Sequence, residues 1–122
     1  MNQQTPTTIL VIGTDTYFCY LLSRYVRASA HELMISAFDQ NAVEVAQREK
    51  PVLIIIEDVL PKIKGREIIE KFKANETTCK IPVVSCSWHN PETEEGKGGA
   101  DYWLHMPILF GDFKAILDNL GI

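Results

Sequence analysis

A run of apolar residues from Val52 to Ile56 passes directly into two acids, Glu57 and Asp58. A strand that is buried on both faces needs such a run, because it has no solvent-facing side for alternate polar residues. A carboxylate is costly to bury inside such a strand, so we expect both acids at its carboxyl end. In open α/β sheets this edge is where ligands bind. The run therefore predicts a central parallel strand at 52–57 with a candidate site at its end.

Strand and helix patterns alternate along the whole chain. Short β-branched and apolar runs predict further strands at 8–12, 32–38, 81–86 and 101–105. Apolar residues at helical spacing predict helices at 16–29 (with Asp15 as its N-cap), from about Ala42 and ending before Pro51, at 65–75 and at 109–120. Short connections and right-handed crossovers then give one doubly wound domain, with a five-stranded parallel sheet and helices on both faces.

One more helix is expected between the last two strands, but its pattern is weak. The sequence Asn90-Pro91-Glu92 suits a helix start, whereas three glycines, Gly96, Gly98 and Gly99, follow at once. Each glycine costs about 1 kcal/mol in a helix interior. We therefore expect this fourth helix in chain order to be short or partly unwound.

Length and charge restrict the class of protein. The 122 residues suit one domain, predicted at 8–122 after a flexible tail at 1–7. A net charge of −4 argues against direct binding to nucleic acid, and no apolar run is long enough to span a membrane. The start of the chain lacks the features of a signal peptide, and the three cysteines form no Cys-x-x-Cys pair. These features predict a cytoplasmic protein with reduced thiols.

Four short motifs, in order and at consistent spacings, resemble those of response-regulator receiver domains of two-component signalling. They are Lys50-Pro51 before the central strand, Leu60-Pro61 with Gly65, Ile81-Pro82-Val83-Val84 before Ser87, and Gly99-Ala100-Asp101 before Pro107. The resemblance covers about residues 8–120. It implies a flavodoxin-like strand order of 2-1-3-4-5 and a role in phosphorelay-type signalling through protein partners.

The resemblance also implies where the family's phosphoryl chemistry would lie. The acidic pair that holds Mg²⁺ corresponds to Gly13 and Thr14, and the acceptor aspartate corresponds to Glu57. The hydroxyl position is kept as Ser87, whereas the lysine position is Met106. Four of these five positions are changed, which indicates a degenerate receiver, or pseudo-receiver.

These changes should end phosphoryl transfer, which depends on positioning and on charge neutralisation. Mg²⁺ binds mainly through carboxylates and waters, and only Glu57, with some help from Asp15, remains here. We expect no catalytic residue, no metal site and no Mg²⁺ or other cofactor. Glu57 is then either a fixed mimic of the phosphorylated state, reaching Thr14 or Ser87, or a solvated carboxylate at a strand end.

Two other residues bear on signalling. Asp58 is a candidate displaced acceptor, although strand alternation points it away from Glu57 and favours a role in the following turn. Trp103 corresponds to the family's aromatic switch position, so it is either a switch locked in one rotamer or an edge aromatic. The resemblance implies about three more residues between Ser87 and Gly99 in a typical receiver, which is nearly one helical turn. We therefore expect the usual partner surface to be altered here.

The leading hypothesis is a non-enzymatic receiver-like domain that acts through protein contacts, with a homodimer as one form of partner. An atypical phosphoacceptor that uses Glu57 or Asp58, and a small-molecule or nucleotide binder at the same sheet edge, remain alternatives. Cys86-x-x-His89 resembles half a zinc site, but four ligands would have to converge. The residues after the first strand match neither G-x-G-x-x-G nor the P-loop pattern.

Overall fold

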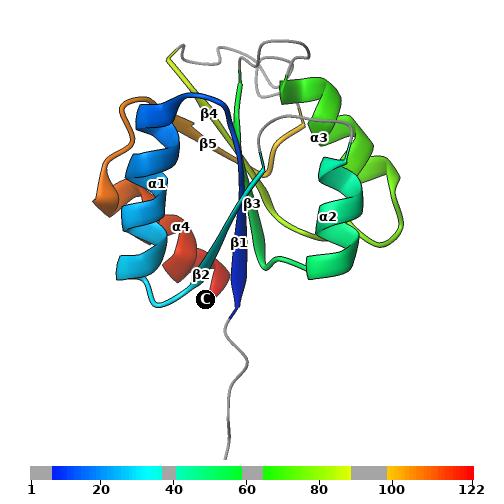
Figure 1. The fold of residues 1–122 in the computed structure, drawn as a ribbon, viewed down its shortest axis with the longest axis horizontal. Helices are drawn as coiled ribbons and strands as arrows, with labels where there is room; N and C mark the ends of the chain where they lie inside the picture. The colour runs from blue at the N-terminus through cyan, green and yellow to red at the C-terminus, as the bar shows by residue number, and fades with distance from the viewer. Residues whose placement is uncertain (1–6, 37–40, 59–64, 89–98) are drawn as a thin grey trace, which may run out of the picture.

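The computed structural model describes residues 7–36, 41–58, 65–88 and 99–122. Its strands are β1 (Thr8–Ile12), β2 (Glu32–Ser36), β3 (Leu53–Glu57), β4 (Val83–Ser87) and β5 (Tyr102–His105). Its helices are α1 (Thr16–Ala28), α2 (Ala42–Glu49), α3 (Gly65–Ala74) and α4 (Phe110–Leu120). The strands form one parallel sheet in the order β2-β1-β3-β4-β5 (Figure 1). The predicted fold class and strand order are confirmed.

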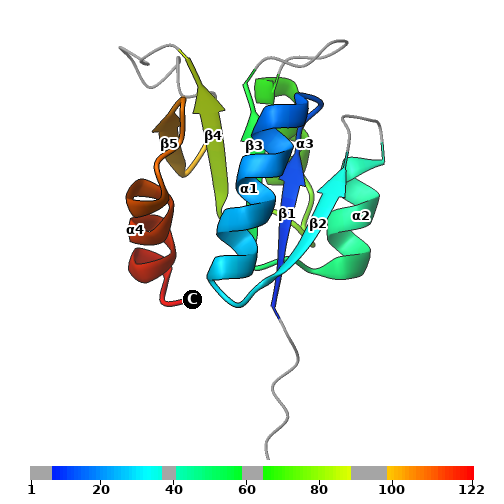
Figure 2. The ribbon, with the colours of Figure 1, turned by 60° about the vertical axis from the view of Figure 1, so that its left-hand side comes forward.

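Helices cover both faces of the sheet. Helices α1 and α4 lie on one face, and α2 and α3 lie on the other (Figures 1 and 2). The side chains of β3 alternate between the two, since Leu53 and Ile55 pack with α1 and α4, whereas Ile54 and Ile56 pack with α2 and α3. All four are fully buried, which is why this strand has no polar positions before Glu57.

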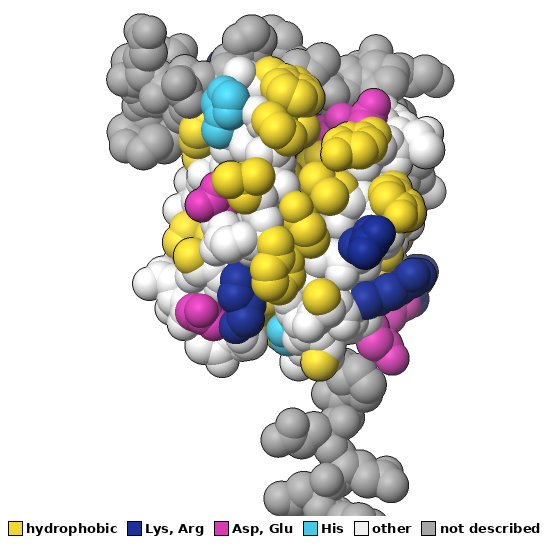
Figure 3. Space-filling view, turned by 90° about the vertical axis from the view of Figure 1, so that its left-hand side faces the viewer, with side chains coloured by type: hydrophobic (Ala, Val, Ile, Leu, Met, Phe, Trp, Pro, Cys, Tyr) yellow, Lys and Arg dark blue, Asp and Glu magenta, His cyan; other side chains and the backbone are white. Residues whose placement is uncertain are grey.

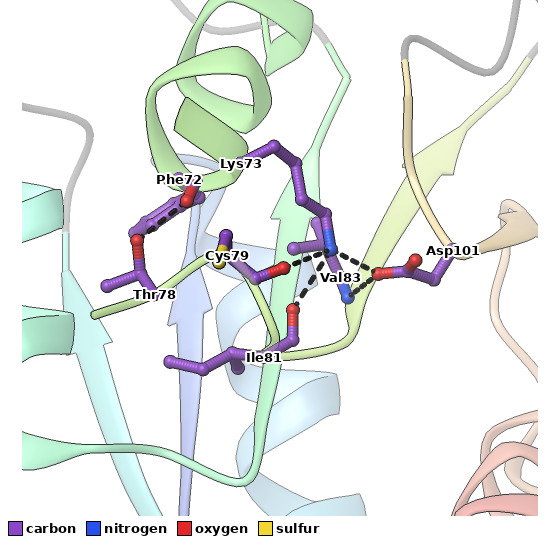
Figure 4. A network of polar contacts seen from close by, with 7 residues as sticks. All are labelled: Phe72, Lys73, Thr78, Cys79, Ile81, Val83 and Asp101. Atoms are coloured by element: carbon purple, nitrogen blue, oxygen red, sulfur yellow. Dashed lines mark hydrogen bonds and ion pairs between the residues drawn. The ribbon is translucent and has the colours of Figure 1, made fainter. Parts of the chain in front are cut away.

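Strand β4 differs from its predicted span because a polar cluster occupies its start (Figure 4). The carbonyl of Ile81 accepts a hydrogen bond from Lys73 Nζ at 3.2 Å, and Ile81 N donates to Thr78 O at 3.0 Å. Asp101 Oδ2 accepts from Val83 N at 2.8 Å. Ile81 lies in a bend after the preceding turn, whereas the Pro82 carbonyl already accepts from Ile54 N of β3 at 3.0 Å. The strand itself begins at Val83, so the predicted start at 81 is wrong by two residues. The strand also extends to Ser87, one residue past its predicted end.

The other described boundaries lie within one residue of the predictions. The helix predicted to start at 109 begins at Phe110, and the helix predicted to end at 29 ends at Ala28. The strand predicted to start at 101 begins at Tyr102, after the Asp101 side chain has joined the cluster in Figure 4. Such shifts are usual where a helix or strand ends by its hydrogen bonds rather than by its side-chain pattern.

Several predictions fall on residues that the structure does not describe. They are the tail at 1–6, the end of the strand predicted to reach 38, the Leu60-Pro61 turn, and the short fourth helix expected within 89–98. Next to the tail, Thr7 already lies against the sheet, where its carbonyl accepts from Glu32 N at 2.9 Å. Within the described residues, no helix has the length and apolar character needed to cross a membrane.

Candidate functional site

Glu57 ends the central strand, and its carboxylate is turned toward the start of helix α1. Its Oε1 accepts hydrogen bonds from the backbone N–H groups of Thr14 at 2.6 Å and Asp15 at 3.0 Å. Only 8% of the residue is exposed. Backbone N–H groups at a helix start stabilise an anion through hydrogen bonds and through the helix dipole. Glu57 is therefore a buried carboxylate with two N–H donors, which the alternative of a solvated carboxylate did not anticipate.

Gly13 lies where the Glu57 carboxylate comes closest to β1. A Cβ atom placed on Gly13 would lie 2.5 Å from Glu57 Oε1 and 2.9 Å from two ring carbons of Phe18. Distances below about 3 Å mean that another atom must move, so this backbone position accepts no side chain while Glu57 keeps its present place. The Glu57 side chain thus fills the space beside Gly13, the position at which the receiver resemblance implies an acid.

Asp15 is the N-cap of α1, as predicted. Its Oδ2 accepts a hydrogen bond from Phe18 N at 2.7 Å, and its backbone is extended, as at most N-caps. One oxygen of this carboxylate is therefore directed at the helix backbone. Thr14 contributes its backbone N–H to Glu57, and the residue itself is exposed.

Ser87 and Met106 lie side by side at the ends of β4 and β5. Met106 N donates to Ser87 O at 2.8 Å, and both residues are buried. Met106 packs in the core cluster between the sheet and helices α1 and α4, next to Leu104 and Ile108. The position of the expected lysine is therefore filled by an apolar side chain.

Trp103 is half-buried on the edge strand β5 and its ring meets that of His105 edge-on, with centroids 5.8 Å apart. Its neighbours in sequence, Tyr102 and Leu104, pack on the α1/α4 side of the sheet. Side chains alternate along a strand, so Trp103 belongs to the other face. The structure does not bring it together with Glu57.

Asp58 contributes backbone groups to the end of β3. Its N–H donates to Cys86 O at 2.8 Å, and its carbonyl accepts from Gly65 N at 2.9 Å. A Cβ on Gly65 would lie 2.7 Å from Glu57 O, so this glycine allows the start of α3 to approach the strand end. The turn that Asp58 is predicted to cap lies outside the described residues.

A cavity of about 240 Å³ lies between the N-terminal part of α1 and the segment that joins β5 to α4. Its walls are mostly apolar, with two carboxylates, and are formed by Asp15, Tyr17, Phe18, Leu21, Glu57, Trp88, Met106, Pro107 and Ile108. Sequence reasoning missed Tyr17 and Trp88. Both are large aromatic residues that do not fit the apolar periodicity of the predicted helices and strands. This misfit was the feature of the sequence that could have marked them as surface residues of a site.

Two cysteines lie close to the Glu57 charge. Burial raises the pKa of the Cys86 thiol far above its ordinary value, and the negative charge of Glu57 adds to the effect. Burial also raises the pKa of Cys19, with smaller contributions from Glu57 and Asp15. All three cysteines are free in the structure. His89, the partner that a zinc site would need, lies outside the described residues.

Sequence comparisons find relatives among response regulators. The chain is 26% identical over 121 residues to the phosphate regulon transcriptional regulatory protein PhoB of Pseudomonas aeruginosa, covering 93% of this chain but 53% of PhoB. It is 22% identical over 120 residues to the polar-differentiation response regulator DivK of Brucella anthropi, covering 95% of this chain and 98% of DivK. The chain therefore spans about half of the first relative and nearly all of the second. No protein-family model matches it.

Solved structures share the fold over nearly the whole chain. The chemotaxis response regulator CheY4 of Vibrio cholerae superposes with a TM-score of 0.84 at 18% identity, covering 95% of this chain and 99% of that chain. The receiver domain of a sensor histidine kinase from Pseudomonas aeruginosa, with magnesium coordinated in its active-site cleft, gives 0.86 at 17% identity, covering 97% and 100%. At these identities the structures show the fold alone. The relatives and the fold together support the assignment of this chain to the response-regulator receiver domains of two-component signalling.

Proposed function

We propose that this chain is a pseudo-receiver: a signalling domain that acts through protein contacts and does not undergo aspartyl phosphorylation. The observation that carries the proposal is the arrangement of Glu57 and Gly13. The Glu57 carboxylate accepts two backbone N–H groups and fills the space beside Gly13. The position of the acceptor thus holds a carboxylate with its own donors, directly beside a position that has no room for a second acid while Glu57 keeps this place.

The donor groups at this site do not fit Mg²⁺, which prefers an octahedral shell of carboxylate, phosphate and water oxygens. Gly13 offers no side-chain oxygen, and Oε1 of Glu57 already accepts two hydrogen bonds. One oxygen of Asp15 caps α1. Within the described residues, no three His, Cys, Asp or Glu side chains gather as a metal site would require. These contacts support a domain that works without the metal.

Glu57 suits the role of a permanent negative charge. N–H groups at helix starts are the usual partners of phosphate oxygens in proteins, and here Oε1 takes two of them. The mimic hypothesis named Thr14 or Ser87 as the partner of Glu57, and the contact with Thr14 is made by its backbone N–H. We propose that the domain is held in one state by this fixed charge, and that it has no enzymatic activity of its own.

Phosphorylation by a small-molecule donor tests the proposal. The intact chain would be incubated with acetyl phosphate and Mg²⁺ and weighed by mass spectrometry, next to a receiver domain that has the full acid set. We expect no change in mass for this chain and, for the control, a gain of one phosphoryl group that hydroxylamine removes. The same gain on this chain would overturn the proposal, and Glu57→Gln and Asp58→Asn would then locate the acceptor.

A further inference from the structure

The cavity beside Glu57 opens on a surface with unusually large exposed apolar side chains. Tyr17 is 64% exposed and Trp88 is 62% exposed, and both line the cavity. Leu109 and Phe110, which follow the cavity residue Ile108, are 63% and 39% exposed. Figure 3 shows hydrophobic side chains gathered along the middle of this face of the molecule. Gathered apolar side chains on a soluble domain mark an interaction surface, unlike scattered ones. We call these four residues and the cavity the α1–α4 groove.

The groove is held in shape by contacts between its two sides. The hydroxyl of Tyr25, from α1, donates to the carbonyl of Ile108 at 2.8 Å. The Tyr25 ring also meets the Phe110 ring edge-on, with centroids 5.3 Å apart. These contacts link α1 to the segment before α4. A groove with fixed sides loses little conformational entropy when a partner binds.

The charges in the groove have one sign. Asp15 and Glu57 line the cavity, and none of the described residues that line it is Lys, Arg or His. Met106 lines the cavity at the position where the receiver resemblance implies a lysine. The cavity therefore combines two carboxylates with the rings of Tyr17, Phe18 and Trp88. Carboxylates together with aromatic faces attract an organic cation by ion pairing and cation–π contacts.

We infer that the α1–α4 groove binds an arginine side chain of a partner protein, which supplies in trans the cation that Met106 removed in cis. The inference rests on the proposed function, because it names the chemistry of the protein partner. A guanidinium is planar, stacks on aromatic rings and binds carboxylates through several donors, so it suits this lining better than an ammonium. Its aliphatic stem packs against apolar walls such as Leu21, Met106 and Ile108.

A matched pair of small probes tests the inference on the full chain. N-acetyl-arginine methylamide would be titrated into the isotope-labelled protein and followed by the amide signals of Thr14 and Asp15, which report on the Glu57 carboxylate. N-acetyl-citrulline methylamide, nearly the same shape without the charge, is the control. We expect saturable shifts with the arginine probe, with a Kd on the order of millimolar, and binding of the citrulline probe about 5-fold weaker or more.

Two variants place the cation in the cavity. Asp15→Asn keeps the helix cap but removes one charge, so it should weaken arginine binding about 3-fold to 10-fold. Met106→Lys puts an ammonium into the cavity and should abolish binding, with the amide spectrum confirming the fold. Equal binding of the two probes, shifts only outside the groove, absence of saturable shifts, or undiminished binding to Met106→Lys would each overturn the inference. If these tests fail while acetyl phosphate leaves the mass unchanged, the proposed function stands without this inference.

Discussion

At the scale of single residues, the position of the Glu57 side chain depends on the absence of a side chain at Gly13. The glutamate reaches its two N–H donors because no side chain stands at position 13. An aspartate at 57 is one methylene shorter and would withdraw its oxygens from this space. A change at either position therefore has to be judged with the other present. A side chain at position 13 and the carboxylate of Glu57 would therefore compete for the same space.

Gly13→Ala should destabilise the protein by about 1–3 kcal/mol, because the new methyl would overlap Glu57 Oε1 and the Phe18 ring. Urea unfolding of the variant measures the change. Gly13→Ala combined with Glu57→Ala should lose less than the sum of the single changes, with a coupling of about 0.5–3 kcal/mol. Additive losses would show that the two residues do not share this space.

Gly111→Ala is the matched control for that experiment. Gly111 is the second residue of α4, and a Cβ there meets no atom within 4 Å. Alanine is a better helix former than glycine, so this variant should gain about 0.5–1 kcal/mol in the free energy of unfolding. Opposite signs for the two glycine substitutions would separate close packing at Gly13 from a general effect of adding a methyl group.

At the scale of elements, the start of α1 depends on Asp15. Asp15→Ala removes the hydrogen bond from Phe18 N and should cost about 0.5–2 kcal/mol in the free energy of unfolding. Asp15→Asn keeps an oxygen acceptor and should stay within a few tenths of a kcal/mol of the wild type. Urea unfolding of both variants checks this. Similar losses in the two would mean that charge, rather than capping, is what α1 requires.

A second element-scale contact joins the end of α3 to the starts of β4 and β5 (Figure 4). Lys73 Nζ pairs with Asp101 Oδ2 at 2.7 Å, and the same oxygen accepts from Val83 N. Asp101→Asn keeps an oxygen that can accept from Val83 N, and Lys73→Met keeps the apolar part of the lysine side chain. The two variants together therefore measure the interaction between the two charges. The pair is partly exposed, so we expect a coupling of only about 0.5–1 kcal/mol, decreasing with salt. A double-mutant cycle by urea unfolding, repeated in high salt, measures it.

At the scale of the whole molecule, Cys86 links global stability to pH. Its thiol stays protonated when folded because burial raises its pKa, whereas an unfolded thiol ionises near about pH 8.5. The stabilising effect is thus complete below that pH and is lost as the pH rises. Above it, unfolding releases a proton, so the free energy of unfolding should decrease by about 1.4 kcal/mol per pH unit.

Urea unfolding between about pH 7 and 10 measures this slope against the ordinary thiol pKa. Cys86→Ala is the control: it should be less stable at every pH, because it leaves a cavity, but its decline with pH should be smaller. The difference between the two curves isolates Cys86 from tyrosines and lysines that titrate in the same range. Parallel curves would show that the folded thiol titrates normally.

The sequence by itself determined the parallel sheet, and its resemblance to receiver domains implied the strand order. The uninterrupted apolar run before Glu57 allows no solvent-facing side, and the alternation of strand and helix patterns allows few topologies. The N-cap at Asp15 was also readable, because capping is local in sequence. The start of β4 could not be predicted from the sequence, because it depends on contacts with Lys73 and Asp101, which are distant along the chain.

Only the tertiary structure decided which groups the Glu57 carboxylate contacts and how deeply it is buried. Sequence reasoning placed it at a strand end and left open a solvated carboxylate or a charge with partners. The distance from Oε1 to the N–H groups of Thr14 and Asp15, and the space beside Gly13, come from the packing of β1, β3 and the start of α1. The groove arises in the same way, because α1 and the segment before α4 meet only in the folded chain. Contacts between distant segments have no periodicity, so the sequence pattern does not reveal them.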